Sequence, residues 1–346
     1  MGKIPKNLQN DELSEYLSSC GLTRVSQGKV RDTWRLNLDR LLVVATDRIS
    51  IFDFVLNALI TKKGEVLTAL THFWLTKVLG DKFSHHLVAS KIDERFNAAY
   101  GLKAGRLPNL PIERCLVVKD LTGLIYIFEM IFRLFIGGSV FKKYQETSMA
   151  GGHLLPPNLP KWSKLDKPIF TPSTKEDVGH DVNVDVDYFF AEMTKTKSRA
   201  EIEAVVENLA KAYLKAYEYA ESRGVLILDT KFEVAGMEIV DEILTPDSSR
   251  FALAEDWKKA MAEGRDPYFY DKQIVRDWGS KVETPFGVVG INKLNPANPE
   301  HVSFVHSLEL PDEISQETTR RYLTIFKLIT SCSLEDYQRE EMGVEI

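Results

Sequence analysis

Three charged side chains alternate along one stretch of the chain that reads as a β-strand. Within VLILDTKFEV, residues 225–234, Asp229, Lys231 and Glu233 are separated by uncharged residues, so in a strand they share one face. Two carboxylates and an ammonium group on one inner face suit a magnesium ion that bridges nucleotide phosphates. The spacing fits a solvent-facing strand equally well, so this stretch leaves two alternatives.

A second strand, predicted at 237–244, carries Asp241, whose direction depends on the loop that joins the two strands. A two-residue Ala-Gly loop places Asp241 on the opposite face from Glu233. A three-residue loop, 235–237, pairs Lys231 with Asp241, so that all four charges converge on one face. Residue spacing alone leaves both registers open.

A polar turn follows this hairpin. The stretch 244–250, LTPDSSR, contains Pro246 and Asp247, two residues that favour turns. Such a turn presents Asp247 and Arg250 at the end of the sheet, where ligands tend to bind. An ordinary polar turn has the same composition.

A glycine precedes the strand predicted at 30–36. Lys29 and Arg31 are two residues apart, so they share a strand face and are suited to holding phosphates. Gly28 permits close approach of the backbone to a ligand. The pattern is neither a Walker A loop nor a GxGxxG fingerprint, so by itself it does not identify a nucleotide site.

Two further groups of polar residues are candidates for the site, one within an apolar run and the other within a polar stretch. Glu129 and Arg133 lie four apart in the apolar run 124–136, which fits a structural ion pair. In TPSTKEDVGHD, residues 171–181, Lys175, His180 and Asp181 are candidate ligands of a polar substrate, although a histidine beside an aspartate is commonly a hydrogen-bonded loop residue. The sequence contains neither HExxH nor GxSxG, which leaves zinc chemistry and a serine nucleophile without support.

The elements that must position these residues are strands interleaved with helices, which predicts an α+β fold. Periodicity predicts strands at 30–36, 41–46, 114–119, 124–136, 225–234 and 237–244. It also predicts three helices. The first covers 64–80, and the second begins at a capping box at Ser198 and ends at Gly224. The third covers 312–330, with Tyr322, Ile325, Phe326 and Ile329 facing inward. The segment 147–183 has five prolines and no periodicity, and we expect a functional loop there.

Length and charge limit the class of protein. The 346 residues suggest two or three lobes, and the net charge of −6 argues against nucleic acid or an anionic membrane as partner. The strongest apolar run, 124–136, contains two charges and is too short to span a bilayer. Without a secretory signal, and with three widely spaced cysteines, the sequence predicts a cytoplasmic protein with reduced thiols.

Together these stretches resemble the phosphoribosylaminoimidazole-succinocarboxamide synthases (SAICAR synthetases) of purine biosynthesis. TPDSSR and DKQxVRDW are long and specific, and the matching stretches follow the family's order from about residue 25 to 280. They are QGKVRD (27–32), LLVVATDRISIFD (41–53), KKGEVLTALTHFW (62–74), FTPSTKEDVGHD (170–181), LILDTKFE (226–233), DEILTPDSSRF (241–251) and YDKQIVRDW (270–278).

The resemblance implies a two-lobed fold and a ligase reaction. A small antiparallel-sheet nucleotide lobe is expected over 1–125. A larger ATP-grasp-like lobe is expected over 126–346, with a substrate loop at 147–183 and C-terminal helices. The implied enzyme uses ATP and Mg²⁺ to join L-aspartate to carboxyaminoimidazole ribonucleotide (CAIR) through an acyl phosphate, releasing ADP and phosphate. We expect a monomer or small homo-oligomer. Two other functions are possible alternatives: another ATP-dependent ligase or kinase, and a non-catalytic ATP-binding homologue.

The resemblance also implies residue roles. The residues implied for the nucleotide are Gly28, Lys29, Arg31, Lys119 and Glu129. Those implied for the ribonucleotide or aspartate are Arg133, Ser139, Lys175, His180, Asp181, Asp247 and Arg250. Glu233 and Asp241 are implied as magnesium ligands, and Asp229 and Lys231 as residues of the reacting centre.

The chain departs from the family pattern in three places, one of which is Thr61-Lys-Lys63-Gly64 where the family reads Pro-x-Lys-Gly. Where the family reads close to PVEVVVRGYLTGSGWKEY, residues 126–144 read YIFEMIFRLFIGGSVFKKY, which keeps the spacing of Glu129, Arg133 and Ser139. The hairpin between Glu233 and Asp241 is also shorter than usual. Its even spacing of eight residues favours the three-residue loop, which puts both carboxylates on one face.

Overall fold

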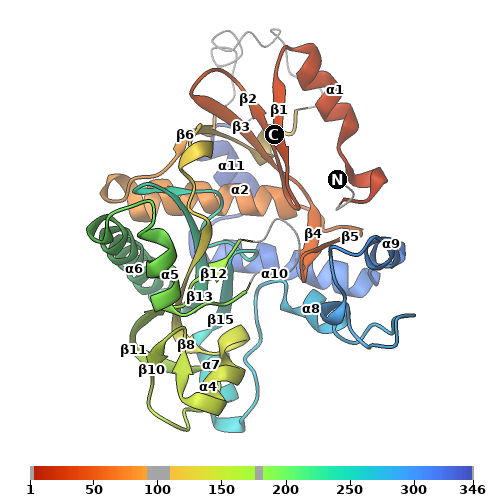
Figure 1. Ribbon diagram of the computed structural model, residues 1–346. Coiled ribbons are helices and arrows are strands. Elements are labelled where there is room, and N and C mark those ends of the chain that lie inside the picture. The colour runs from red at the N-terminus through yellow and green to blue at the C-terminus, as the bar shows by residue number, and fades with distance from the viewer. Residues whose placement is uncertain (1–3, 92–109, 176–181, 345–346) are drawn as a thin grey trace.

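A five-stranded antiparallel sheet, the N-terminal sheet, forms the upper part of the molecule in Figure 1. The computed structural model describes residues 4–91, 110–175 and 182–344. In spatial order the strands are β1 (Thr23–Gln27), β2 (Arg31–Arg35), β3 (Arg40–Ala45), β7 (Cys115–Lys119) and β6 (Leu87–Ala89). The predicted hairpin of strands at 30–36 and 41–46 is therefore confirmed, as is the strand at 114–119.

A second sheet, the central sheet, lies below it. Its main path runs β11 (Ser163–Phe170), β8 (Phe128–Ile136), β13 (Val225–Ala235) and β14 (Glu238–Val240). Two short strands extend it, β12 (Ser173–Thr174) on β8 and β15 (Ser249–Leu253) on β13. The strand expected at 124–136 begins only at Phe128, because residues 122–124 form a 3₁₀ turn.

The predicted helix at 64–80 forms α2 (Lys63–Phe73), which continues into a six-residue π-helix, Trp74–Leu79. The helix expected after Ser198 is α6 (Arg199–Glu221), and its capping box with Glu201 is complete. The remaining helices are α1 (Asp11–Ser19), α4 (Phe141–Thr147), α5 (Val186–Met193), α7 (Ala254–Glu263), α8 (Gln273–Gly279), α9 (Pro299–Ser307), α10 (Asp312–Thr330) and α11 (Leu334–Glu340). None of the helices in the described part of the chain is long and apolar enough to cross a membrane.

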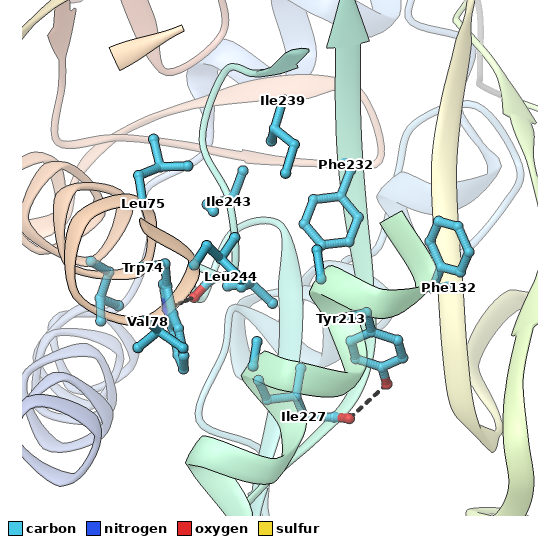
Figure 2. Close-up of a cluster of buried hydrophobic side chains, with 14 of the residues drawn as sticks. Trp74, Leu75, Val78, Phe132, Tyr213, Ile227, Phe232, Ile239, Ile243 and Leu244 are labelled. Atoms are coloured by element: carbon cyan, nitrogen blue, oxygen red, sulfur yellow. Dashed lines mark hydrogen bonds between the residues drawn. The ribbon is translucent and has the colours of Figure 1, made fainter. Parts of the chain in front are cut away.

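The main core lies behind the central sheet, between the sheet and helices α2 and α6. Figure 2 shows apolar side chains from the π-helix that continues α2, from α6 and from the central sheet meeting in one cluster. Two hydrogen bonds satisfy polar atoms inside it: the Trp74 Nε1–H donates to the carbonyl of Leu244 at 2.9 Å, and the Tyr213 hydroxyl donates to that of Ile227 at 2.8 Å. Phe132 and Phe232 point into this core, so their strand neighbours must face the other way.

Helices from the C-terminal third join the two sheets. Helix α10 packs against α2 and α8, and its predicted inward residues Tyr322, Ile325, Phe326 and Ile329 are all buried. The hairpin β4 (Arg48–Ile51) and β5 (Phe54–Leu59) packs against α8 and α9 in a separate apolar cluster. Antiparallel sheets with helices around them confirm the predicted α+β, two-lobed fold.

The segment 147–183 differs from the expected loop. It contains β11 and β12 as well as a small hairpin of β9 (Met149–Ala150) and β10 (His153–Leu154). β11 is an edge strand with several exposed residues, so its sequence lacks the apolar alternation of a core strand. A register shift between Lys164 and Ile169 accommodates Pro168, which has no N–H to donate to the ladder.

The β13–β14 hairpin adopts neither of the two expected registers. Gly236 and Met237 form the loop, Ala235 pairs with Glu238, and Glu233 pairs with Val240. Gly236 supplies the positive φ of 61° that a two-residue turn favours. The favoured three-residue loop is therefore wrong, and the second strand ends at 240 instead of 244 because the chain turns away there.

Candidate functional site

A cavity of about 940 Å³ lies between the N-terminal sheet and the central sheet. The N-terminal side contributes residues of the loop before β2 and of β2–β4, and the central side contributes the exposed face of β8, β13 and the start of β15. Among residues 4–91, 110–175 and 182–344, eight cationic and eight acidic side chains line it, so this part of the lining is balanced in charge. The cations are Lys29, Arg31, Arg133, Lys175, Lys231, Arg250, Lys272 and Arg276, and the acids are Asp53, Glu129, Asp229, Glu233, Asp241, Glu242, Asp247 and Asp271.

The predicted charged face of β13 points into this cavity. Asp229, Lys231 and Glu233 all line it, which excludes the alternative of an outward-facing strand. The two charges of β8 do not pair with each other as expected, because both look across the sheet toward β13. Glu129 accepts from the Lys231 ammonium at 2.7 Å, and Arg133 stands opposite Asp229 and donates to it at 2.7 Å.

Glu233 is held by two lysines. Its carboxylate lies 3.3 Å from the Lys231 ammonium and 2.5 Å from that of Lys175. Burial alone would raise the pKa of Glu233, but the two lysines and Arg31 outweigh it and lower the pKa to about 2. The Lys231 pKa stays well above its ordinary value, because attraction by Glu129, Glu233 and Asp241 exceeds the effect of burial.

Asp241 reaches the same cavity by a route that strand register did not predict. In the observed pairing a continued strand would send it to the opposite face from Glu233. The strand ends instead, and Asp241 adopts a left-handed backbone with a φ of 63°, so its carboxylate turns toward β2. There it accepts from the Arg31 guanidinium at 2.6 Å, while Glu242 lies 2.9 Å from the same guanidinium. Burial, opposed by Arg31, raises the pKa of Asp241 to about 6.

Two arginines share the Asp229 carboxylate at the opposite end of the cavity. Arg133 and Arg250 donate to the same oxygen, and Arg250 also approaches Asp271 at 3.7 Å. Ser139 accepts from Arg133 at 3.3 Å. Gly138 has a φ of +63°, and a Cβ there would lie 3.0 Å from Arg250, so only glycine lets the backbone pass beside the guanidiniums without strain or crowding.

The loop of residues 28–30 before β2, called the glycine loop here, is held by hydrogen bonds from the buried side chain of Arg48. Its turn is closed by the Gly28 N–H, which donates to the Arg31 carbonyl at 2.7 Å. The buried Arg48 guanidinium pairs with Asp32 at 2.5 Å and donates to the carbonyls of Gly28 and Lys29. Lys29 itself reaches across the cavity mouth to Asp53 at 2.5 Å.

One predicted site residue lies elsewhere, and another is more buried than expected. Lys119 is outside this cavity and pairs with Glu238 of the hairpin at 2.8 Å. His180 and Asp181 lie outside the described residues. Asp247 reaches the cavity wall, but its side chain is only 2 % exposed and pairs with the buried Lys63 at 2.9 Å. We therefore correct Asp247 from an open ligand group to a buried anchor.

The structure adds residues that sequence reasoning missed. Lys272, directly before α8, and Arg276, within it, line the cavity, and Asp53 lines it from the turn between β4 and β5. The signal for the pair was present in YDKQIVRDW, because two cations four residues apart share one face of a helix. The Arg48–Asp32 pair had no such signal, since its importance comes only from burial.

Glu233 and Asp241 are the residues that suit a divalent cation. The described residues contain no cluster of three or more histidine, cysteine or acidic side chains that could hold a metal ion. Mg²⁺ commonly uses one or two protein carboxylates and takes its other oxygens from water and substrate phosphates. This donor set therefore fits Mg²⁺ carried by a nucleotide and does not fit an all-protein metal cage.

Comparison with known proteins gives one consistent result. The family model for SAICAR synthetase matches residues 24–289. The phosphoribosylaminoimidazole-succinocarboxamide synthase of Thermodesulfovibrio yellowstonii is 36% identical over 315 residues, 90% of this chain and 96% of that protein. That of Thioalkalivibrio sulfidiphilus is 38% identical over 93% of this chain and 98% of the relative. The solved SAICAR synthase of Saccharomyces cerevisiae, complexed with SAICAR, is 30% identical with a TM-score of 0.68 and covers 90% of this chain and 96% of its own.

Proposed function

The chain belongs to the SAICAR synthetase family, and on that premise we propose how the cavity between its two sheets carries out the family's reaction. The protein is a ligase of purine biosynthesis. It joins L-aspartate to CAIR and yields SAICAR, while ATP is converted to ADP and phosphate. The supporting observation is that a single cavity, reached from both sheets, contains Glu233, Asp241, Lys231 and the arginine pair.

The chemistry requires two successive transfers. A carboxylate is a poor electrophile, so a CAIR carboxylate oxygen first attacks the γ-phosphorus of ATP, and ADP leaves. The amine of aspartate then attacks the acyl carbon, loses a proton and expels phosphate. No protein nucleophile is needed, and the enzyme contributes positioning and charge neutralisation.

We assign the nucleotide end of the cavity to Gly28, Lys29, Arg31, Glu233 and Asp241. The two carboxylates would hold Mg²⁺, which supplies positive charge next to the transferred phosphoryl group. The balanced lining supports this assignment, because a cavity without net positive charge needs a cation to accept a triphosphate. The turn at Gly28 has no room for a side chain, because a Cβ there would lie 2.8 Å from the Arg31 carbonyl oxygen, and Lys29 and Arg31 supply donors for phosphate oxygens.

Lys231 is assigned to the reacting centre. Its strongly raised pKa keeps it protonated, so it acts as a fixed cation beside the transferred phosphoryl group and does not act as a base. Glu129 and Glu233 hold its ammonium from two sides. Asp229 orients the Arg133 and Arg250 guanidiniums, which both contact it.

The arginine end of the cavity is assigned to the anionic substrates. Arg133, Arg250 and Ser139 offer convergent donors for the ribonucleotide. Lys175 lines the same cavity, where it pairs with Glu233, and we assign it to the anionic substrates as well. Arginine suits carboxylate and phosphate oxygens because its donors are planar and paired. The roles of His180 and Asp181 stay predictions, and Lys119 is not part of this proposal.

Coupled ADP release tests the assignment. We expect ADP only when ATP, Mg²⁺, L-aspartate and CAIR are all present, and SAICAR should accumulate in equal amount. Leaving out aspartate or CAIR in turn is the control. ADP release that is indifferent to either substrate would identify a different ligase or an ATPase.

A further inference from the structure

Asp247 is the most heavily paired carboxylate in the wall of the cavity. One of its oxygens lies 2.9 Å from the Lys63 ammonium and 3.7 Å from that of Lys272, and the other accepts from the Tyr322 hydroxyl at 2.6 Å. These partners come from three separate elements: Lys63 begins α2, Lys272 precedes α8, and Tyr322 lies in α10. The carboxylate therefore joins three helices at one point.

Only one member of this cluster is open to the cavity. The side chain of Lys63 is 0% exposed and that of Asp247 2%, whereas Lys272 is 13% exposed and lines the cavity beside Arg276. A lysine ammonium has a long flexible stem, so a fixed anion behind it is what limits where it points. Asp247 is that anion for Lys272.

The electrostatics of the cluster agree with this geometry. Burial lowers the pKa of Lys272 to about 8 against the attraction of Asp247, with Arg276 and Lys63 adding repulsion and Glu242 adding attraction. Burial would raise the pKa of Asp247, but the two lysines and the Tyr322 hydroxyl outweigh it and lower the pKa. The carboxylate is thus charged, with one oxygen fixed by the Tyr322 hydroxyl and the other facing both lysines.

We infer that Tyr322 is a positioning residue of the active site: its hydroxyl fixes the Asp247 carboxylate, and Asp247 holds Lys272 toward the anionic groups of the substrates. Tyr322 lies beyond residues 24–289, the range that the family model matches. The C-terminal helix α10 then completes the cavity wall, although it contributes no side chain to the lining. The inference rests on the proposed function, because it takes the cavity as the place of reaction.

The test measures the dissociation constant of SAICAR by calorimetry with the full-length enzyme. SAICAR contains the phosphate of the ribonucleotide and the carboxylates from aspartate, so it reports on Lys272 wherever that lysine contacts the CAIR or the aspartate part. Tyr322→Phe keeps the ring in the core and removes only the hydroxyl. We expect binding weaker by about tenfold, as for loss of a hydrogen bond to a charged group.

Tyr337→Phe is the matched control. Its hydroxyl is also buried in the C-terminal helices, where it bonds His72 at 2.8 Å, and Tyr337 does not line the cavity. Both variants should lower Tm by a similar amount, but Tyr337→Phe should bind SAICAR within twofold of wild type.

A double-mutant cycle separates positioning from loss of packing. If Tyr322 acts through Lys272, Lys272→Gln and the double variant Lys272→Gln/Tyr322→Phe bind SAICAR equally within twofold. Independent effects that multiply in the double variant overturn the inference, as does binding by Tyr322→Phe within twofold of wild type. Should Tyr322→Phe fail to fold, Asp247→Asn takes its place in the same cycle. Failure of the wild-type enzyme to turn over CAIR and aspartate would instead reject the proposed function.

Discussion

At the scale of single residues, the cavity requires that the side chain of Glu233 carry a negative charge. Two lysines hold its carboxylate in the charged form, and the same carboxylate is proposed to hold Mg²⁺ with Asp241. A group of this kind cannot be replaced by a neutral one of equal shape, because the charge is what the lysines and the cation require.

Glu233→Gln should therefore lower kcat/KM by at least 100-fold, about 3 kcal/mol of transition-state stabilisation, and should raise the Mg²⁺ concentration needed for half-maximal ADP release. Glu238→Gln is the control, because Glu238 lies on the same hairpin but pairs with Lys119 outside the cavity. Activity of Glu233→Gln within tenfold of wild type would contradict the metal role.

Gly138 gives a second prediction at this scale. Gly138→Ala should raise the KM for CAIR about tenfold, because the added methyl group meets the Arg250 and Arg133 guanidiniums at 3.0 and 3.3 Å. Gly264→Ala has nearly the same positive φ, 67°, but nothing within 4 Å of the new Cβ. Each variant should lose about 1 kcal/mol of stability, so an unchanged KM for Gly138→Ala would show that crowding there does not matter.

At the scale of elements, the glycine loop depends on the buried Arg48–Asp32 pair. Both side chains are 1% exposed, and the guanidinium also holds the carbonyls of Gly28 and Lys29. The pair thus connects β4, which supplies Arg48, to β2 and the loop before it.

Arg48→Met should lower the free energy of unfolding by about 3–5 kcal/mol, because it leaves Asp32 charged and buried without its partner. Urea denaturation measures this change. The exposed pair Arg199–Glu203 is the control, and Arg199→Met should cost less than about 1 kcal/mol. Equal losses in the two variants would mean that burial adds nothing to the Arg48 pair.

At the scale of the whole molecule, α2 ties the N-terminal sheet to the C-terminal helices, and His72 lies at that junction. Its ring bonds the Tyr337 hydroxyl at 2.8 Å, and burial lowers its pKa to about 4. The unfolded chain binds a proton at His72 below about pH 6.5, whereas the folded chain does so only near pH 4. Stability therefore falls as the pH drops through this window.

The contribution of His72 to this loss should be about 3 kcal/mol between pH 7 and pH 4. His72→Gln keeps a polar partner for Tyr337 but does not titrate, so its unfolding free energy should fall by that much less than the wild type's over the same range. Urea unfolding at both pH values supplies the comparison. Parallel pH dependence of the two proteins would contradict the prediction.

The charge of the cavity differs from that of the whole chain. The chain has a net charge of −6, whereas the described residues that line the cavity include equal numbers of cationic and acidic groups. On the proposed function, anionic substrates would displace the acidic partners of these cations and bring Mg²⁺ with them, because the described lining has no excess of positive charge. The division of the chain at residue 125 stays a prediction, since α2 packs on α10 across it.

The sequence by itself determined the local elements and the kind of chemistry. Alternation marked the cavity face of β13, a capping box marked α6, and helical spacing marked α10, because these features depend on residues only a few positions apart. Motif order was enough to identify the family.

Tertiary structure alone decided which partner each charged group has. Asp241 lines the same cavity as Glu233 because its backbone is left-handed, and its carboxylate pairs there with Arg31, 210 residues away in the chain. Asp247 became a buried anchor because Lys63 and Tyr322 close around it. Burial and backbone strain of this kind are set by elements distant in the chain, and spacing along the sequence carries no record of them.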